Sequence, residues 1–307
     1  MPRLQLGGTD TLVRPVLTET LGRQECLPHL LLSACKLAVR LRRMSHPIVL
    51  VHGLLGFSRL TVGGLKIAAY FRGIPEALRA AGYVVPEPPK LNPAGTIAQR
   101  AADLQHYLLD STNRDVAGGR VHIIAHSMGG LDTRYMIARL GMAERIASLT
   151  TIGTPHLGSP IADLVASGVN PAMLTLVEKY GVNLRGISDL TSAACAAFNE
   201  EIADDPRVQY FAIAGRYDPQ RVAGIPLGTL GLAHTVIRGK QGDNDGLVSV
   251  RSANFEGRGA AWTTLDTWDA NHFRQVNWGA DILPVNPADH SIVDKYLALA
   301  ARIAALA

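Results

Sequence analysis

The stretch VHIIAHSMGG, residues 121–130, decides the fold. Its apolar run ends at Ala125, Ser127 follows two positions later, and two glycines close the segment. A short apolar run is typical of a buried strand and glycines permit a tight turn, so the pattern predicts a strand feeding a turn with Ser127 at its tip. A serine hydroxyl is a weak nucleophile by itself, and the group that activates it has to come from elsewhere in the chain.

Strands and helices alternate on both sides of this turn. Apolar runs predict strands at 47–51, 83–85, 120–125, 147–153, 208–215 and 263–268. The spacing of apolar residues predicts helices at 73–82, 97–108, 129–141, 189–202 and 291–306. This alternation is typical of an α/β fold, in which helices cover both faces of a mostly parallel sheet. The carboxyl ends of the strands then share one edge, where ligand sites collect.

The predicted domain runs from 45 to 307, because no linker rich in proline and glycine interrupts that stretch. Residues 1–44 differ from it in charge and composition, and we interpret them as an N-terminal extension. From about 158 to 205 the chain carries helical patterns with no strand between them. That segment is therefore predicted to be a helical insertion that caps the edge of the sheet.

The charge of the chain is concentrated in its first residues. Residues 1–43 contain seven Lys or Arg and three Asp or Glu, so the whole net charge of +4 lies there. A nucleic-acid-binding domain normally carries a basic stripe on its folded part, and none is expected here. No apolar run approaches the ~20 residues that a transmembrane helix needs.

The N-terminal region is compatible with more than one cellular location. Leu32–Cys35, LSAC, resembles a lipoprotein processing box, but Pro28 and His29 interrupt the apolar segment before it. A secretory signal wants an uninterrupted apolar core after a basic start. Secretion and a cytoplasmic location are both compatible with this region, and the three cysteines form no zinc-binding pattern.

The turn at Ser127 has the form A-x-S-x-G. Small residues around the serine are required in a nucleophile elbow because the backbone there is strained and crowded. Acyl transfer also needs N–H groups aimed at the developing oxyanion. The backbone N–H of Met128 is one candidate, and the N–H of Leu54, in the loop after the predicted strand 47–51, is the other.

Four histidines follow the serine: His156, His234, His272 and His290. In chains of this kind the acid and base follow in the order Ser…Asp…His. We favour His272 as the base, because it lies just past the last predicted strand. For the acid we favour Asp245, which precedes a Gly turn, and Asp243 remains an alternative.

With these residues in place, the chain resembles the Pseudomonas-type bacterial triacylglycerol lipases of the α/β-hydrolase superfamily. The resemblance rests on the segments HPIVLVHGLLGF, AHSMGG, NDGLVS and NHFRQVNW, in that order. It implies a lipase with Ser127 as nucleophile, Asp245 as acid and His272 as base. It also implies an oxyanion hole made by Leu54 and Met128, and a helical lid that opens at a lipid surface.

One departure from the family concerns metal binding. Arg274 stands where the family usually has a calcium-binding aspartate, and calcium wants about six to eight oxygen ligands. We therefore expect no cofactor and no calcium requirement. Arg274 could instead hold the loop by a bidentate ion pair with Asp218 or Asp266. Alternatively, Arg274 is solvated and the packing of Phe273 and Trp278 holds the loop.

Three other functions remain in competition with a lipase. A lipid acyltransferase or a short-chain carboxylesterase would use the same residues. A non-enzymatic binding protein would usually have lost one of them, and here none is missing. The expected partner is a lipid or ester substrate at a lipid–water interface, without nucleic acid and without a transmembrane anchor.

Overall fold

The computed structural model describes residues 46–54, 59–62, 65–93, 95–168, 184–218, 229–257, 261–278 and 290–306. All of these residues belong to one compact unit, Arg42–Ala307. The predicted extension 1–44 and its LSAC segment lie outside the described residues. None of the helices searched, all within the described ranges, has the length and apolar character of a membrane span.

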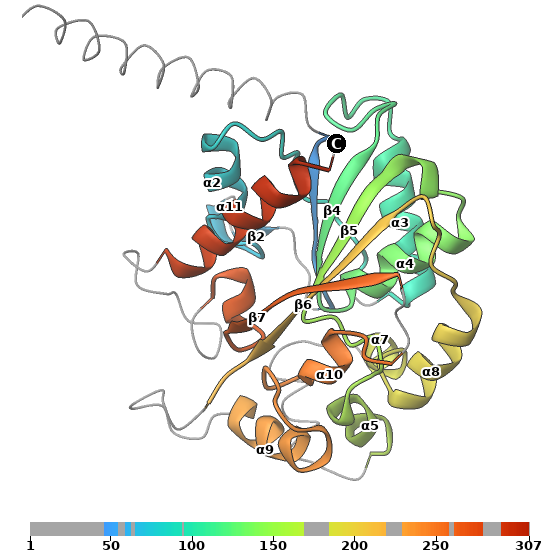
Figure 1. Cartoon of the computed structure of the whole chain (residues 1–307), viewed down its shortest axis with the longest axis vertical. Helices are drawn as coiled ribbons and strands as arrows, with labels where there is room; N and C mark the ends of the chain where they lie inside the picture. The colour runs from blue at the N-terminus through green and yellow to red at the C-terminus, as the bar shows by residue number, and fades with distance from the viewer. Residues whose placement is uncertain are drawn as a thin grey trace, which may run out of the picture. The chain divides into compact units, whose positions relative to one another are not determined.

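A parallel sheet organises the described residues (Figure 1). Its members are β1 (Ile48–Val51), β4 (Val121–His126), β5 (Ile146–Ile152), β6 (Gln209–Arg216) and β7 (Trp262–Asp269). They lie in the order β1-β4-β5-β6-β7, and each neighbouring pair is parallel. The parallel sheet that the sequence predicts is confirmed.

Helices bury both faces of this sheet (Figure 1). On one face Ile48 and Leu50 pack in a core with α2 (Ile74–Ala80) and α11 (Ser291–Ala304). On the other face Val49 and Val51 pack in a core with α3 (Ile97–Leu109) and α4 (Gly129–Arg139). Because successive side chains of a strand point to opposite faces, a continuous apolar run is what a strand covered on both sides requires.

The helical insertion begins after β5. In the described parts of 158–205 the structure has α5 (Pro160–Ala166), α7 (Leu184–Ser188) and α8 (Ser192–Glu201), with no strand among them. After β6 come α9 (Thr229–Gln241) and α10 (Val250–Ala253). Figure 1 places these five helices together at one end of the sheet, and α5 contacts α7, α8 and α9.

Two local features differ from the prediction. Residues 83–85 are not a strand, although Val84 O accepts a hydrogen bond from Ile48 N–H at 2.9 Å. Prolines at 86, 88 and 89 follow directly, and a residue without an N–H cannot continue a ladder of hydrogen bonds. The structure also contains an unpredicted antiparallel pair, β2 (Arg59–Val62) with β3 (Leu65–Ala69). Two short elements, η1 (Ala143–Arg145) and η2 (Arg274–Val276), complete the described secondary structure.

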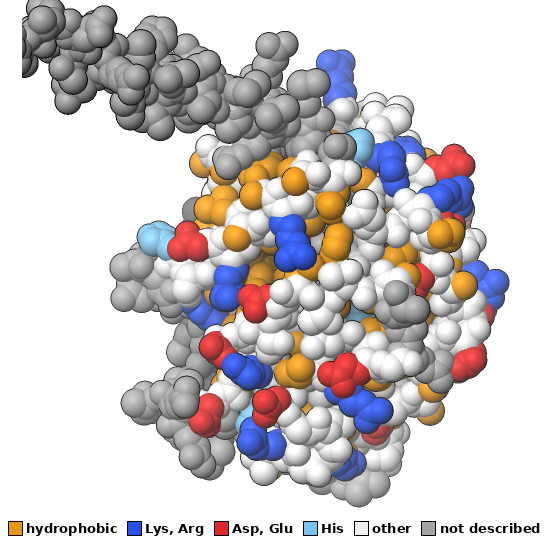
Figure 2. Space-filling model, in the orientation of Figure 1, with side chains coloured by type: hydrophobic (Ala, Val, Ile, Leu, Met, Phe, Trp, Pro, Cys, Tyr) orange, Lys and Arg blue, Asp and Glu red, His pale blue; other side chains and the backbone are white. Residues whose placement is uncertain are grey.

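The sequence places the whole net charge in residues 1–43, so the rest of the chain carries equal numbers of basic and acidic residues. On the face drawn in Figure 2, basic and acidic side chains of the described residues are interspersed.

Candidate active site

The turn at Ser127 has the strained backbone of a nucleophile elbow. Ser127 joins β4 to α4 with a φ of 57°, a conformation that a residue with a side chain rarely adopts. Its N–H donates to Ile152 O at 2.9 Å, and its carbonyl accepts from Thr154 Oγ1 at 2.7 Å. A Cβ at Gly129 would lie 2.8 Å from His52 O, so the glycine is required by the close approach of the loop after β1.

His272 and Asp245 form a buried pair. The Nδ1–H of His272 donates to Asp245 Oδ2 at 2.8 Å, and Asp245 is completely buried. Its other oxygen accepts from the backbone N–H groups of Leu247 at 2.9 Å and Val248 at 2.8 Å. The backbone N–H of His272 also donates to Asp245 O at 2.9 Å. This pairing orients the imidazole, and in the neutral ring with its proton on Nδ1 the lone pair lies on Nε2, as a general base requires.

The pair lies close to the serine turn. The ring of His126, the residue before Ser127, is 4.5 Å from the ring of His272, centroid to centroid. The hydrogen bonds of the described residues do not include one from Ser127 Oγ to His272. Such contacts are often long in the absence of substrate and tighten when it binds.

The other candidate bases lie in different surroundings. His156 is buried against Phe255 and Trp262, at ring distances of 5.0 and 4.7 Å. His234 lies within α9, and His290 is exposed at the start of α11. The structure does not bring any of these three to Asp245.

Asp243, the alternative acid, forms an exposed ion pair instead. Its carboxylate pairs with Arg238 at 3.1 Å, and both side chains are more than half exposed. The structure therefore favours Asp245 as the partner of His272.

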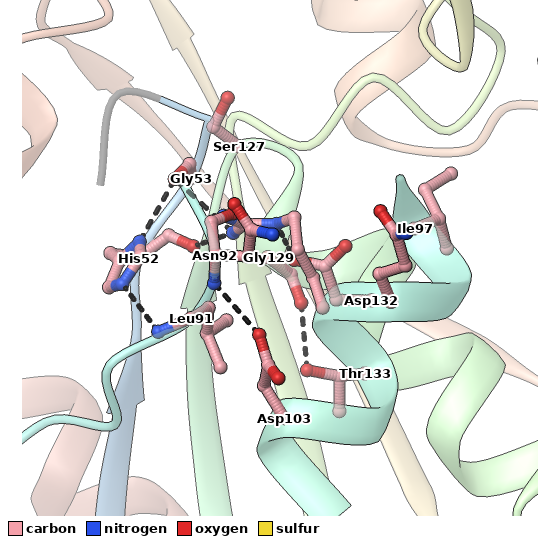
Figure 3. Close-up of polar contacts among 12 residues, drawn as sticks. His52, Gly53, Leu91, Asn92, Ile97, Asp103, Ser127, Gly129, Asp132 and Thr133 are labelled. Carbon is pink, nitrogen blue, oxygen red and sulfur yellow. Dashed lines mark hydrogen bonds and ion pairs between the residues drawn. The ribbon is translucent and has the colours of Figure 1, made fainter. Parts of the chain in front are cut away.

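The two candidate oxyanion donors are not occupied by any other described residue. Within the described residues, neither the N–H of Met128 nor that of Leu54 donates a hydrogen bond. Both residues are buried, and Gly53, just before Leu54, lies directly against Ser127 (Figure 3). Free N–H groups held in a buried site are what stabilisation of an oxyanion needs.

An arginine that the sequence analysis missed supports this loop. Arg100 is fully buried and donates from Nη2 to His52 O at 2.7 Å and to Gly53 O at 3.2 Å. Its Nε donates to Asp132 Oδ2 at 2.8 Å. Burial raises the pKa of Asp132 to about 7, against the opposing effect of Arg100. A signal was present in the sequence, since Arg100 falls on the apolar face of α3, between Ile97 and Leu104.

We expect Arg100→Met to lower the free energy of unfolding by about 3–5 kcal/mol, because it leaves the Asp132 carboxyl buried without its partner. Without Arg100 the pKa of Asp132 in the folded state rises further above its unfolded value, so the folded protein holds that proton to higher pH. The decrease in the free energy of unfolding relative to the wild type should therefore grow as the pH rises through about 7. Urea unfolding at pH 5 and pH 8 measures both effects.

The matched control is Arg216→Met, which breaks an exposed pair with Asp269. Such pairs contribute about 0–1 kcal/mol. Equal destabilisation by the two substitutions would show that the buried pair does not anchor the loop.

The residue two positions after the histidine has an amide and a hydroxyl among its described partners. Arg274 donates to Asn277 Oδ1 at 3.1 Å and to Ser291 Oγ at 3.0 Å, which ties the histidine loop to the start of α11. Of the two carboxylates considered for it, Asp266 pairs with Lys295 at 3.4 Å. In the described ranges there is no group of three or more His, Cys, Asp or Glu side chains placed to hold a metal ion.

Comparisons with known proteins agree with this geometry. Residues 103–202 match the family model for lecithin:cholesterol acyltransferase. Triacylglycerol lipase 2 of Saccharomyces cerevisiae is 32% identical over 216 residues, which cover 68% of this chain and 62% of that protein. A triacylglycerol lipase of Pseudomonas fragi is 36% identical over 129 residues, which cover 42% of this chain and 41% of that one. The chain is thus similar to triacylglycerol lipases.

Solved structures share the α/β-hydrolase fold of this chain. The mature lipase BlEst2 of Bacillus licheniformis superposes with a TM-score of 0.63 at 23% identity, over 85% of this chain and 92% of that one. This likeness shows the fold that the sequence predicts. The chain spans less than two thirds of the length of the yeast and P. fragi relatives.

Proposed function

We propose that this protein is a serine-dependent ester hydrolase that acts as a triacylglycerol lipase through an acyl-enzyme intermediate. The observation that carries the proposal is the buried His272–Asp245 pair beside the strained turn at Ser127. The names of its relatives support a lipid ester as substrate.

The mechanism follows from the positions of these groups. His272 Nε2 takes the proton of Ser127 as its Oγ attacks the ester carbonyl. The N–H groups of Met128 and Leu54 bind the oxyanion of the tetrahedral intermediate. His272 then gives the proton to the departing alcohol, and a water molecule, activated by the same imidazole, releases the fatty acid. Asp245 keeps the imidazole in the required tautomer throughout.

The helical insertion is proposed to be a lid. Leu54 and Met128 share an apolar cluster with residues of α5, α7 and α8, including Val165, Ile187 and Cys195. A side chain at Gly186 in α7 would overlap Leu54. The insertion thus packs directly on the oxyanion residues, and its displacement at a lipid surface would expose them. The apolar residues Leu174, Leu176 and Val177 of the insertion lie outside the described residues.

A lipid acyltransferase is the second candidate, because the match at residues 103–202 is to a family named for that reaction. Initial rates on p-nitrophenyl esters from C2 to C16 and on a triglyceride emulsion, with and without an added alcohol, separate the candidates. A lipase prefers long chains and emulsified substrate and releases mainly fatty acid. Transfer to the alcohol as the main reaction would favour the acyltransferase, and activity restricted to soluble short-chain esters would favour a carboxylesterase.

We expect treatment with EDTA to leave both the activity and the Tm unchanged. Arg274 contributes no oxygen ligand, and its contacts with Asn277 and Ser291 hold the histidine loop without an ion. Activity and thermal melts before and after EDTA test this expectation, with magnesium as the control. A loss that calcium restores and magnesium does not would mean that other residues form a calcium site.

A further inference from the structure

A buried amide contacts the candidate acid on the side opposite its backbone donors. Gln275, in η2, is fully buried, and its Nε2 lies 2.7 Å from Asp245 Oδ2. This is the oxygen that also accepts from His272. A Cβ at Gly153 or Gly215 would overlap the Gln275 amide, so glycines on β6 and after β5 make the space that it occupies.

The contact with Asp245 fixes the orientation of the Gln275 amide. An ionised carboxylate only accepts hydrogen bonds, so the NH₂ group faces Asp245 and Oε1 faces away. Gln275 Oε1 and His126 Nε2 are both buried without a hydrogen bond of ordinary length and angle in the described residues. Burial and the neighbouring His272 lower the pKa of His126 well below its usual value, and hydrogen-bonding interactions with the His272 backbone and with the Gln275 side chain oppose them.

The other nitrogen of His126 leads to the oxyanion loop. Its Nδ1 lies 2.7 Å from the hydroxyl of Tyr70, which accepts a hydrogen bond from Gly53 N–H at 3.1 Å. An amide oxygen cannot donate, so the contact with Gln275 requires the proton on Nε2 of a neutral His126. Nδ1 is then an acceptor, and the Tyr70 O–H donates to it.

We propose that Gln275 and His126 are positioning residues of the catalytic acid. A directional chain runs from Gly53 N–H through Tyr70 and His126 to Gln275, which donates to Asp245. The chain couples the loop that carries one oxyanion donor to the carboxylate that orients His272. The inference rests on the proposed function, because Asp245 is an acid partner only in that reaction.

This arrangement also separates the roles of the two neighbouring histidines. His126 and His272 lie in contact, but His126 is enclosed by Tyr70 and Gln275 and has no carboxylate of its own. It stays neutral and serves as a hydrogen-bond link. His272, with Asp245 on Nδ1, is left as the base.

The first test reads the proton positions directly. Long-range ¹H–¹⁵N correlation spectra of histidine-labelled protein should show His126 as the neutral Nε2–H tautomer, unchanged from pH 5 to pH 9. The groups that face it are Tyr70, His272 and Gln275, with Asp245 beyond. The resonance is assigned by its loss in His126→Gln. A proton on Nδ1, or a titration within that range, would overturn the proposal.

The second test is kinetic. Gln275→Met keeps the size of the side chain and removes its donor and acceptor, so kcat should fall by about 10- to 100-fold while KM changes little, because a misplaced acid acts on the chemical step. The matched control is Gln105→Met in α3, which removes an amide that donates to Leu140 O at 2.8 Å. Equal effects of the two substitutions on kcat would show that Gln275 only packs.

Failure of this inference and failure of the proposed function give different results. The spectra need no substrate, so they report the tautomer of His126 even if the protein hydrolyses no ester, and also if Gln275→Met does not fold. Normal ester hydrolysis together with an Nδ1–H tautomer would refute the hydrogen-bond chain alone.

Discussion

Ser127→Ala should lower kcat on p-nitrophenyl esters by about 10⁴-fold or more. The substitution removes the oxygen that would form the acyl-enzyme and leaves no other nucleophile at the tip of the turn. The fold should be retained, since the backbone hydrogen bonds of residue 127 to Ile152 and Thr154 do not involve its side chain. Rates are compared with the wild type, and thermal melts measure stability.

Ser252→Ala provides a control with the opposite outcome. Its buried hydroxyl donates to Gly158 O at 2.8 Å and accepts from Leu157 N–H at 3.0 Å, and neither partner is a candidate catalytic residue. We expect a loss of about 1–3 kcal/mol in stability, because backbone groups lose their partner, with kcat unchanged. Substantial activity in Ser127→Ala would remove the basis for an acyl-enzyme mechanism.

Local sequence patterns predicted the parts of the site that lie close together in the chain. The elbow needs small residues beside a serine at the end of an apolar strand, and 121–130 supplies them within ten positions. The capping box of α3 is similarly local, with Gln99 N–H donating to Thr96 Oγ1 at 3.4 Å and the Gln99 side chain accepting from Thr96 N–H at 3.0 Å. Such contacts depend on spacing along one element, which a sequence states directly.

The residues that support the site could not be found in this way. Gln275 contacts Asp245 across 30 positions, and Arg100 reaches His52 across 48. Their partners are set by how the elements pack. The apolar face of α3 indicates that Arg100 is buried but does not identify its partners, and Gln275 belongs to no periodic pattern. Nothing in the local sequence marks the Gln275 amide as functional. Its position beside the acid depends on the space left by Gly153 and Gly215.

Asp245→Asn should lower kcat by about 10⁴-fold, because an amide there allows the imidazole to take the wrong tautomer. Asp245 Oδ2 accepts from both His272 and Gln275, and neither donor can be replaced by water in a fully buried site. The substitution should therefore also reduce stability.

Asp243→Asn is the matched comparison, two residues away and chemically identical. Asp243 is exposed and pairs only with Arg238 among its described ion pairs, so its loss should cost about 0–1 kcal/mol and leave kcat unchanged. The two variants, measured side by side on one ester across pH, decide which aspartate serves His272. A large loss in Asp243→Asn with activity retained in Asp245→Asn would reverse the assignment and place the acid on the exposed side of the turn.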